Sequence, residues 1–178
     1  MKYLKHITLA ALLVFAFALA MAADNEGGSS EEKTSEGIQW MSYDAGLQKA
    51  AKENKHVFID FTAKWCGYCK KMDRETFSKP EVIDMINKSF VPVRVDGDSQ
   101  QELNIDGYKI TESNLTKQEF GVRGYPTFWF LKSDGTKLGA ITGYRPADVM
   151  IDALTFVRDG KYDTTGTDQG GDKNKENN

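Results

Sequence analysis

Apolar residues recur along this chain with two different spacings, and these predict an alternation of strands and helices. Alternating or continuous apolar positions predict strands at residues 38–41, 57–61, 91–95, 127–131 and 137–142. Helical spacing, capping residues and prolines in first turns predict helices at about residues 43–54, 67–77, 80–90, 115–120 and 146–158. This order favours an α/β fold with a mixed central sheet that has helices on both faces.

The segment at residues 97–113 interrupts this alternation. It is polar, contains Gly107 and shows little periodicity. A long irregular segment inside a compact domain is usually either functional or disordered. We therefore expect an extended loop inserted in the domain, and the sequence leaves its order and its role open.

The N-terminal residues have the pattern of an export signal. Lys2 and Lys5 precede an uncharged apolar run at residues 7–21. That run is as long as a signal-peptide core and short for a membrane span, and Ala20-Met21-Ala22 fits a small-x-small cleavage site. We predict a signal peptide at residues 1–22, with an uncleaved anchor as the alternative. Cleavage implies a periplasmic or secreted protein in an oxidising compartment.

Two further segments are poor in large apolar side chains. Residues 23–37 are rich in Gly, Ser and Glu, and residues 161–178 in Gly, Asp, Asn, Thr and Lys, with Tyr162 as the one large side chain. Such compositions do not bury enough apolar area to fold. We predict a disordered linker and a disordered C-terminal tail on either side of one domain at residues 38–160, which is long enough for a single core.

The charge of the chain argues against a nucleic-acid partner. Its 23 basic and 26 acidic residues give a formal net charge of −3. Cleavage after Ala22 would remove Lys2 and Lys5 and no acidic residue, which makes the remaining chain more acidic. Nucleic-acid-binding surfaces need clustered Lys and Arg. We find no such cluster in the sequence and expect no nucleic-acid partner.

The chain has two cysteines, Cys66 and Cys69. Cys66 lies where a predicted strand gives way to a predicted helix, so its sulfur faces unpaired helix N–H groups and the positive end of the helix dipole. Both lower the pKa of a thiol and favour the reactive thiolate. Cys69 is one helical turn further on, close enough to close a small disulfide ring. We predict that Cys66 attacks a substrate disulfide and that Cys69 resolves the mixed disulfide.

Other uses of a Cys-x-x-Cys pair fit less well. A zinc site needs four ligands, and His56 is the sole histidine outside the predicted signal peptide. Haem attachment needs His directly after the second cysteine, where this chain has Lys70. A structural disulfide stays open, although so small a ring removes little chain entropy. We expect no metal.

Two separated motifs resemble the thioredoxin family. The first is Trp65-Cys66-Gly67-Tyr68-Cys69-Lys70 preceded by Asp60-Phe61, and the second is Val122-Arg123-Gly124-Tyr125-Pro126-Thr127-Phe128, which is similar to the cis-proline loop of the family. Gly143 falls where the family has a late glycine, and the resemblance covers about residues 38–158. The helix opening at Trp40 and the Glu75-Thr76-Phe77-Ser78 run also resemble exported thioredoxin-like reductases, including the C-terminal domain of the bacterial transmembrane reductase DsbD.

The resemblance assigns roles to further residues. It implies that Asp60 lies beneath the cysteines and takes a proton from Cys69, which fits a carboxyl whose pKa is raised by burial in an apolar strand. It also implies a cis peptide bond before Pro126 and a substrate groove, where the backbone of Tyr125 pairs with an extended peptide. We expect Trp65 to be exposed beside Cys66, with a core position as the alternative. The residues expected to contact substrate are Trp65, Gly67, Tyr68, Gly124, Tyr125 and Pro126.

The chain departs from the family pattern at two positions. Pro92 stands where thioredoxins have a buried lysine near the aspartate, and Arg94 on the same strand face is a candidate substitute. Tyr68 stands where cytosolic thioredoxins have a proline between the cysteines. Residues inside the motif alter the pKa of the attacking thiol and the redox potential. The proton route and the direction of electron flow are therefore open.

These features together predict a protein-disulfide reductase, a thiol–disulfide oxidoreductase that reduces disulfides of exported proteins through Cys66 and Cys69. The alternatives are an oxidase or isomerase of the same fold, or a non-catalytic module that binds peptides. Expected partners are protein disulfides and a membrane electron donor of the DsbD type, because an exported dithiol must be kept reduced. We expect no cofactor beyond the redox-active disulfide, and a monomer.

Overall fold

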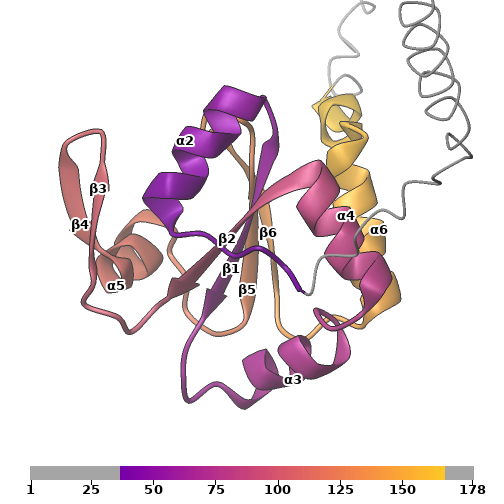
Figure 1. Cartoon of the computed structure of the whole chain (residues 1–178), viewed down its shortest axis with the longest axis horizontal. Coiled ribbons are helices and arrows are strands. Elements are labelled where there is room, and N and C mark those ends of the chain that lie inside the picture. Colours follow the sequence, from indigo (N-terminus) through magenta and orange to yellow (C-terminus); the bar gives the residue numbers. More distant parts are fainter. Residues whose placement is uncertain (1–36, 167–178) are drawn as a thin grey trace, which may run out of the picture. The chain divides into compact units, whose positions relative to one another are not determined.

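The computed structural model describes residues 37–166 of the chain (Figure 1). The predicted signal peptide at residues 1–22, almost all of the predicted linker at 23–37 and the end of the predicted tail lie outside the described residues. None of the helices within 37–166 combines the length and the apolar character that a membrane crossing requires.

A four-stranded sheet forms the centre of the domain, in the order β2-β1-β5-β6. The strands are β1 (His56–Thr62), β2 (Phe90–Asp96), β5 (Thr127–Leu131) and β6 (Lys137–Thr142). β1 pairs in parallel with β2 and antiparallel with β5, and β5 pairs antiparallel with β6. The predicted mixed sheet is therefore confirmed.

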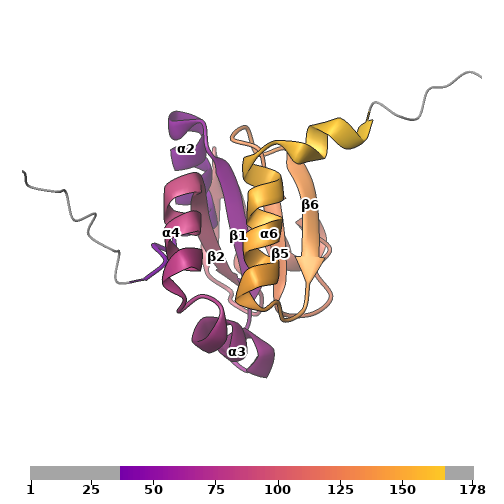
Figure 2. The same ribbon diagram turned by 90° about the vertical axis from the view of Figure 1, so that its right-hand side faces the viewer.

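Helices cover both faces of this sheet (Figure 2). They are α2 (Tyr43–Glu53), α3 (Gly67–Glu75), α4 (Pro80–Ser89) and α6 (Ala147–Arg158). Successive side chains of a strand point to opposite faces. Ile59 of β1 therefore packs in one cluster with Tyr43 of α2, whereas Phe58 packs in another with Ile86 of α4 and Leu154 of α6. The predicted α/β fold with helices on both faces is confirmed.

The predicted first strand at residues 38–41 is wrong. Only Met41 pairs with the sheet, through one parallel bridge to Val93. Immediately afterwards the chain turns into α2, and Gln39 donates its backbone N–H to the Asn87 side chain rather than to a strand, at 3.0 Å. The segment is thus too short to continue the ladder.

The segment at residues 97–113 is an ordered β-hairpin and not an irregular loop. Its strands are β3 (Glu102–Ile105) and β4 (Tyr108–Thr111), joined at Asp106 and Gly107, which both have positive φ (Figure 1). Asp-Gly is a strong signal for such a two-residue turn. Leu103 and Ile110 face each other and are buried in the cluster beneath α2. The polar composition concealed this short alternation.

The two remaining helical segments also differ in detail from the prediction. The predicted helix at 115–120 begins earlier, as α5 (Glu112–Asn114), and continues as the π-helix η1 (Leu115–Glu119). Its first turn is capped by Thr111, whose hydroxyl accepts the Asn114 N–H at 3.2 Å. Thr111 is therefore the N-cap of this helical segment.

The predicted disordered tail does not begin at Lys161. A 3-10 helix, η2 (Lys161–Gly166), follows α6. Tyr162 packs against the cluster beneath α6, and its hydroxyl lies 2.7 Å from Nε2 of His56. The folded part of the chain therefore continues beyond its predicted end, where this one large side chain is partly buried.

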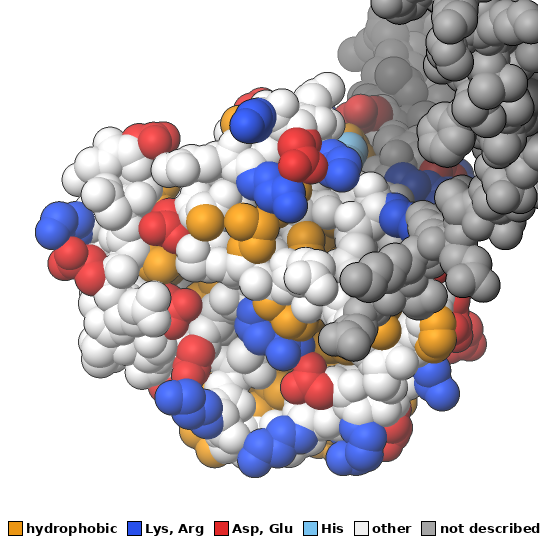
Figure 3. Space-filling view, viewed as in Figure 1, with side chains coloured by type: hydrophobic (Ala, Val, Ile, Leu, Met, Phe, Trp, Pro, Cys, Tyr) orange, Lys and Arg blue, Asp and Glu red, His pale blue; other side chains and the backbone are white. Residues whose placement is uncertain are grey.

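Charged side chains of both signs are distributed over the surface. Figure 3 shows lysines and arginines interspersed with aspartates and glutamates on the face that it draws. Many of these groups pair, for example Lys109 with Glu102 at 2.8 Å across the hairpin.

The burial of Leu103 predicts that the hairpin contributes to the stability of the core. Leu103→Ala removes a buried side chain and should lower the free energy of unfolding by about 2–4 kcal/mol, because the cavity relaxes only in part. Tyr108→Ala, on an exposed side chain of the same hairpin, should change it by less than about 0.5 kcal/mol. Urea denaturation measures both variants. Equal, small effects would mean that the hairpin does not share the core.

Candidate active site

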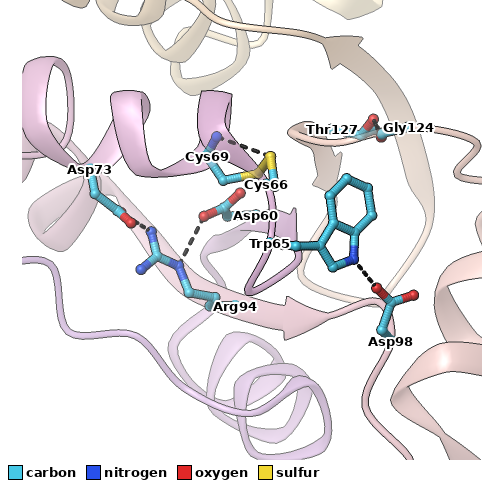
Figure 4. The surroundings of a disulfide bond; sticks show 9 residues. All are labelled: Asp60, Trp65, Cys66, Cys69, Asp73, Arg94, Asp98, Gly124 and Thr127. Atoms are coloured by element: carbon cyan, nitrogen blue, oxygen red, sulfur yellow. Dashed lines mark hydrogen bonds and ion pairs between the residues drawn. A yellow bond between two sulfur atoms is a disulfide. The ribbon is translucent and has the colours of Figure 1, made fainter.

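Cys66 and Cys69 form a disulfide at the first turn of α3. β1 ends at Thr62, a tight turn follows in which the Cys66 N–H donates to the Ala63 carbonyl, and Cys66 then occupies the N-cap of the helix. The backbone N–H of Cys69 donates to Sγ of Cys66 at 3.0 Å (Figure 4). An N–H donor and the helix N-terminus both stabilise a negative sulfur. Cys66 is thus placed as the better thiolate of the pair.

Two exposed aromatic rings accompany the buried cysteines. Trp65 is 70% exposed and Tyr68 is 64% exposed, whereas both cysteines are nearly fully buried. The Trp65 indole donates to a carboxylate oxygen of Asp98 at 2.5 Å (Figure 4). Its ring packs edge-on against Tyr125. The prediction that Trp65 is exposed is confirmed.

The loop before β5 lies against the disulfide. The Tyr125–Pro126 peptide bond is cis, and the Thr127 hydroxyl donates to the Gly124 carbonyl at 2.8 Å. Tyr125 packs against the cluster of Ala63, Cys66 and Cys69. The structure therefore brings Gly124, Tyr125 and Pro126 to the same place as the cysteine motif.

A groove of about 480 Å³ runs from this loop towards β6. Its lining includes residues 120–127 together with Trp129, Ala140, Thr142 and Gly143. Gly143 donates its N–H to the Pro126 carbonyl at 2.8 Å and has a φ of 81°, which suits glycine. The groove shares Tyr125 with the surroundings of the disulfide.

Asp60 is a carboxylate in the middle of the sheet, next to the two cysteines in Figure 4. It is 2% exposed, and Nε of Arg94 donates to its Oδ2 at 2.9 Å. Its Oδ1 has no hydrogen-bond partner among the described residues. Desolvation raises the pKa of Asp60 to about 6, against the opposing effect of the Arg94 charge, and the negative charge of Asp73 adds to the rise. A carboxyl with this pKa can accept and release a proton near neutral pH.

Arg94, the candidate substitute for the family lysine, contacts Asp60 from the neighbouring strand. Asp60 and Arg94 are register partners on β1 and β2. A second nitrogen of Arg94 donates to Oδ1 of Asp73 on α3 at 2.6 Å, and the guanidinium carbon lies 4.2 Å from the centre of the Trp40 ring. The predicted proximity of Arg94 to Asp60 is therefore confirmed, since the two side chains are hydrogen-bonded.

Sequence reasoning missed three residues of this site. Asp73 could have been suspected, because it lies four positions after Cys69 and so on the same side of the helix. No local signal pointed to Asp98 or to Gly97. A Cβ added to Gly97 would lie 1.9 Å from the Tyr125 hydroxyl, so glycine at this position allows that ring to sit where it does.

The predicted absence of a metal rested on counting ligands. Within residues 37–166, no group of three or more His, Cys, Asp or Glu side chains is arranged to hold a metal ion.

The sequence profile of a family described as a thioredoxin-like domain matches residues 43–158. The chain belongs to the thioredoxin-like domain family. The matched residues of this thioredoxin-like domain include both cysteines, Asp60, Arg94 and the loop with the cis bond before Pro126.

Curated relatives support this family assignment, and a solved structure shows the same fold. The thioredoxin-like domain is 31% identical over 125 residues to a protein disulfide-isomerase of Gallus gallus, which covers 70% of this chain and 22% of that protein. It is 31% identical over 105 residues to the thiol:disulfide interchange protein DsbD of Campylobacter jejuni, covering 58% of this chain and 16% of that protein. A thioredoxin from Thermus thermophilus superposes with a TM-score of 0.61 at 23% identity, covering 78% and 99% of the two chains, and shows the shared fold. The chain thus spans about a fifth of the length of such curated relatives.

The burial of Asp60 predicts a pH-dependent stability. Because its pKa is raised in the folded state above the ordinary aspartate value of 3.8, folding favours the protonated form. The contribution of Asp60 is therefore most favourable below about pH 4 and is lost as the pH rises through about 6. Asp60→Asn, which does not ionise, should gain about 2–3 kcal/mol of unfolding free energy relative to the wild type between pH 4 and pH 7.5.

Urea denaturation at several pH values checks this expectation. Asp84→Asn on α4 is the matched control, because it removes a surface carboxylate that pairs with Lys88 at 3.7 Å. This control measures what the loss of a surface carboxylate does by itself at each pH. A constant difference for Asp60→Asn would contradict the raised pKa.

Proposed function

We propose that this protein is a thiol–disulfide oxidoreductase that reduces the disulfides of exported proteins through Cys66 and Cys69. The observation that carries the proposal is the Cys66–Cys69 disulfide at a helix N-terminus, next to a carboxyl whose pKa is about 6. This pair can alternate between dithiol and disulfide, and so carries two electrons itself. No other cofactor is part of the proposal.

The chemistry has two steps. In the reduced enzyme the Cys66 thiolate attacks one sulfur of a substrate disulfide and forms a mixed disulfide. Cys69 then loses its proton to Asp60, attacks Sγ of Cys66 and releases the substrate as a dithiol. The near burial of Cys69 and Asp60 favours transfer of the proton between them, because water has little access to either.

Substrate binding follows from the surfaces around the disulfide. Trp65 and Tyr68 offer exposed apolar rings, and the backbone of Tyr125 can pair with an extended peptide in the groove. The residues proposed to contact substrate are Trp65, Gly67, Tyr68, Gly124, Tyr125 and Pro126.

The cellular setting is part of the proposal. The basic and apolar pattern of residues 1–22 supports export to the periplasm or the exterior, with cleavage after Ala22. In an oxidising compartment the cysteine pair needs a source of electrons. We propose a membrane donor of the DsbD type, in line with the similarity to DsbD, and a monomeric protein that acts on other proteins.

A second candidate is an oxidase or isomerase with the same site. It is favoured by the similarity to protein disulfide-isomerases and by Tyr68 between the cysteines. Equilibration of the Cys66–Cys69 pair with glutathione buffers separates the two. A reduction potential of about −250 mV or lower supports the reductase, and one of about −180 mV or higher supports the oxidase or isomerase.

The two cysteines should have separable roles in an insulin-reduction assay with dithiothreitol as electron donor. Cys66→Ser should lower the rate to the uncatalysed background, because the attacking thiolate is gone. Cys69→Ser should also lose turnover and, once it has been reduced and freed of dithiothreitol, should accumulate a mixed disulfide with insulin, visible on a non-reducing gel. The Cys66→Ser/Cys69→Ser double variant, which forms no mixed disulfide, is the control. A wild-type protein that does not raise the rate above the dithiothreitol background would instead favour the non-catalytic binding module.

A further inference from the structure

We infer that Asp73, acting through Arg94, is a positioning residue for the resolving step, in which Cys69 displaces the substrate from Cys66. The inference rests on the proposed function for the step that it serves, but its structural basis is independent. Asp73 lies on α3 and Arg94 on β2, so the two elements on either side of Asp60 contribute to one arrangement.

The guanidinium of Arg94 joins a buried carboxylate to a surface carboxylate. Its Nε donates to Oδ2 of Asp60 at 2.9 Å, and its Nη2 donates to Oδ1 of Asp73 at 2.6 Å (Figure 4). The Asp60 side chain is 3% exposed, that of Arg94 28% and that of Asp73 49%. The three groups thus form a line from the core to the solvent.

This line needs its outer end. An arginine side chain has several rotatable bonds, and a partly exposed guanidinium is stabilised by water when it turns outward. Asp73 holds the outer nitrogen, and the Trp40 ring, 4.2 Å from the guanidinium carbon, covers its face. Together they keep Nε directed at Oδ2 of Asp60.

The arrangement determines which oxygen of Asp60 can receive a proton. Arg94 occupies Oδ2, and Oδ1 is buried without a hydrogen-bond partner among the described residues. Arginine does not give up its proton in proteins, so Arg94 supplies a fixed charge and does not transfer the proton itself. Oδ1 therefore remains as the acceptor on the buried carboxylate.

The step balances with these groups, the substrate sulfur and one proton from water. The proton of the Cys69 thiol passes to Oδ1 of Asp60, and the Cys69 sulfur forms a bond to Sγ of Cys66. The bond from Cys66 to the substrate sulfur breaks, and its electron pair leaves on that sulfur, which takes a proton from water. The two cysteines lose two electrons in total, and the substrate disulfide gains them.

Removal of the Asp73 charge should shift the pKa of Asp60 in opposite directions under two interpretations. The charges that act on Asp60 are Arg94 from β2, which lowers its pKa, and Asp73 from α3, which raises it, and the effect of Arg94 is the larger. If Asp73 is only a nearby negative charge, its removal lowers the pKa of Asp60. If Asp73 holds Arg94 in place, its removal frees the guanidinium and raises the pKa of Asp60.

The test is the titration of Asp60 in the disulfide form of the full chain, where the cysteines do not titrate. Carboxyl carbon NMR follows the group, and its signal is assigned by its loss in Asp60→Asn. Asp73→Asn should move the midpoint upward by about one pH unit, a tenfold change in the protonation equilibrium. Arg94→Gln should move it upward at least as far, and Asp73→Asn in the Arg94→Gln background should not raise it further. Asp84→Asn should leave it unchanged.

A kinetic measurement links the titration to the resolving step. Reduced protein is mixed with a small aromatic disulfide, which forms a mixed disulfide with Cys66. Stopped-flow absorbance then measures the resolving step, in which Cys69 releases the aromatic thiol. In Asp73→Asn the apparent pKa of resolution should rise with that of Asp60, and the rate near pH 6.5 should fall several-fold. Circular dichroism of each variant verifies the fold.

A downward or absent movement of the midpoint in Asp73→Asn would overturn the inference, as would an upward movement that persists in the Arg94→Gln background. An unchanged resolution profile despite a raised midpoint would equally refute a role in this step. Failure of the proposed function has a different signature: the wild type would not reduce insulin, whatever the titration shows. The two failures are therefore distinguishable.

Discussion

The burial of one carboxylate in a strand that is covered on both faces constrains the rest of the structure. β1 lies in the interior of the sheet, and all its residues from Val57 to Phe61 are buried. Only Asp60 among them is charged, and desolvation of a carboxylate costs several kcal/mol unless a partner compensates. Arg94 supplies the opposite charge from the next strand, and its own charge is balanced at the surface by Asp73. The candidate site thus holds an ionisable carboxyl group near the sulfurs at a cost in folding stability.

Local patterns predicted those parts of the fold that depend on neighbours in the sequence. The apolar runs of β1, β2 and β5, the Pro80 start of α4 and the cysteine motif at the start of α3 each carry their signal within a few residues. The prediction of a strand at 38–41 was wrong because the apolar residues there match a strand pattern, whereas the short segment before α2 forms only one bridge to the sheet. The hairpin was missed because two inward-facing residues in a polar stretch are a weak pattern.

The site was less predictable than the fold, and the reason is register. Asp60 meets Arg94 because β1 and β2 pair in parallel at that position, and no sequence period encodes which residues of two distant strands become neighbours. The link from Arg94 to Asp73 adds a third element to the same problem. The two motifs, by contrast, placed Cys66 and Tyr125 at one site correctly, since each is recognisable by itself.

Gly97, directly after β2, makes its contribution through the absence of a side chain. The Tyr125 hydroxyl occupies the space that a Cβ at this position would need, and the same ring packs against Trp65 and against the cluster of Ala63 and the two cysteines. The position of the ring therefore depends on a residue on its far side that has no side chain of its own. A larger residue at position 97 would displace the Tyr125 ring, and so alter the surroundings of the disulfide while both cysteines and Asp60 stay the same.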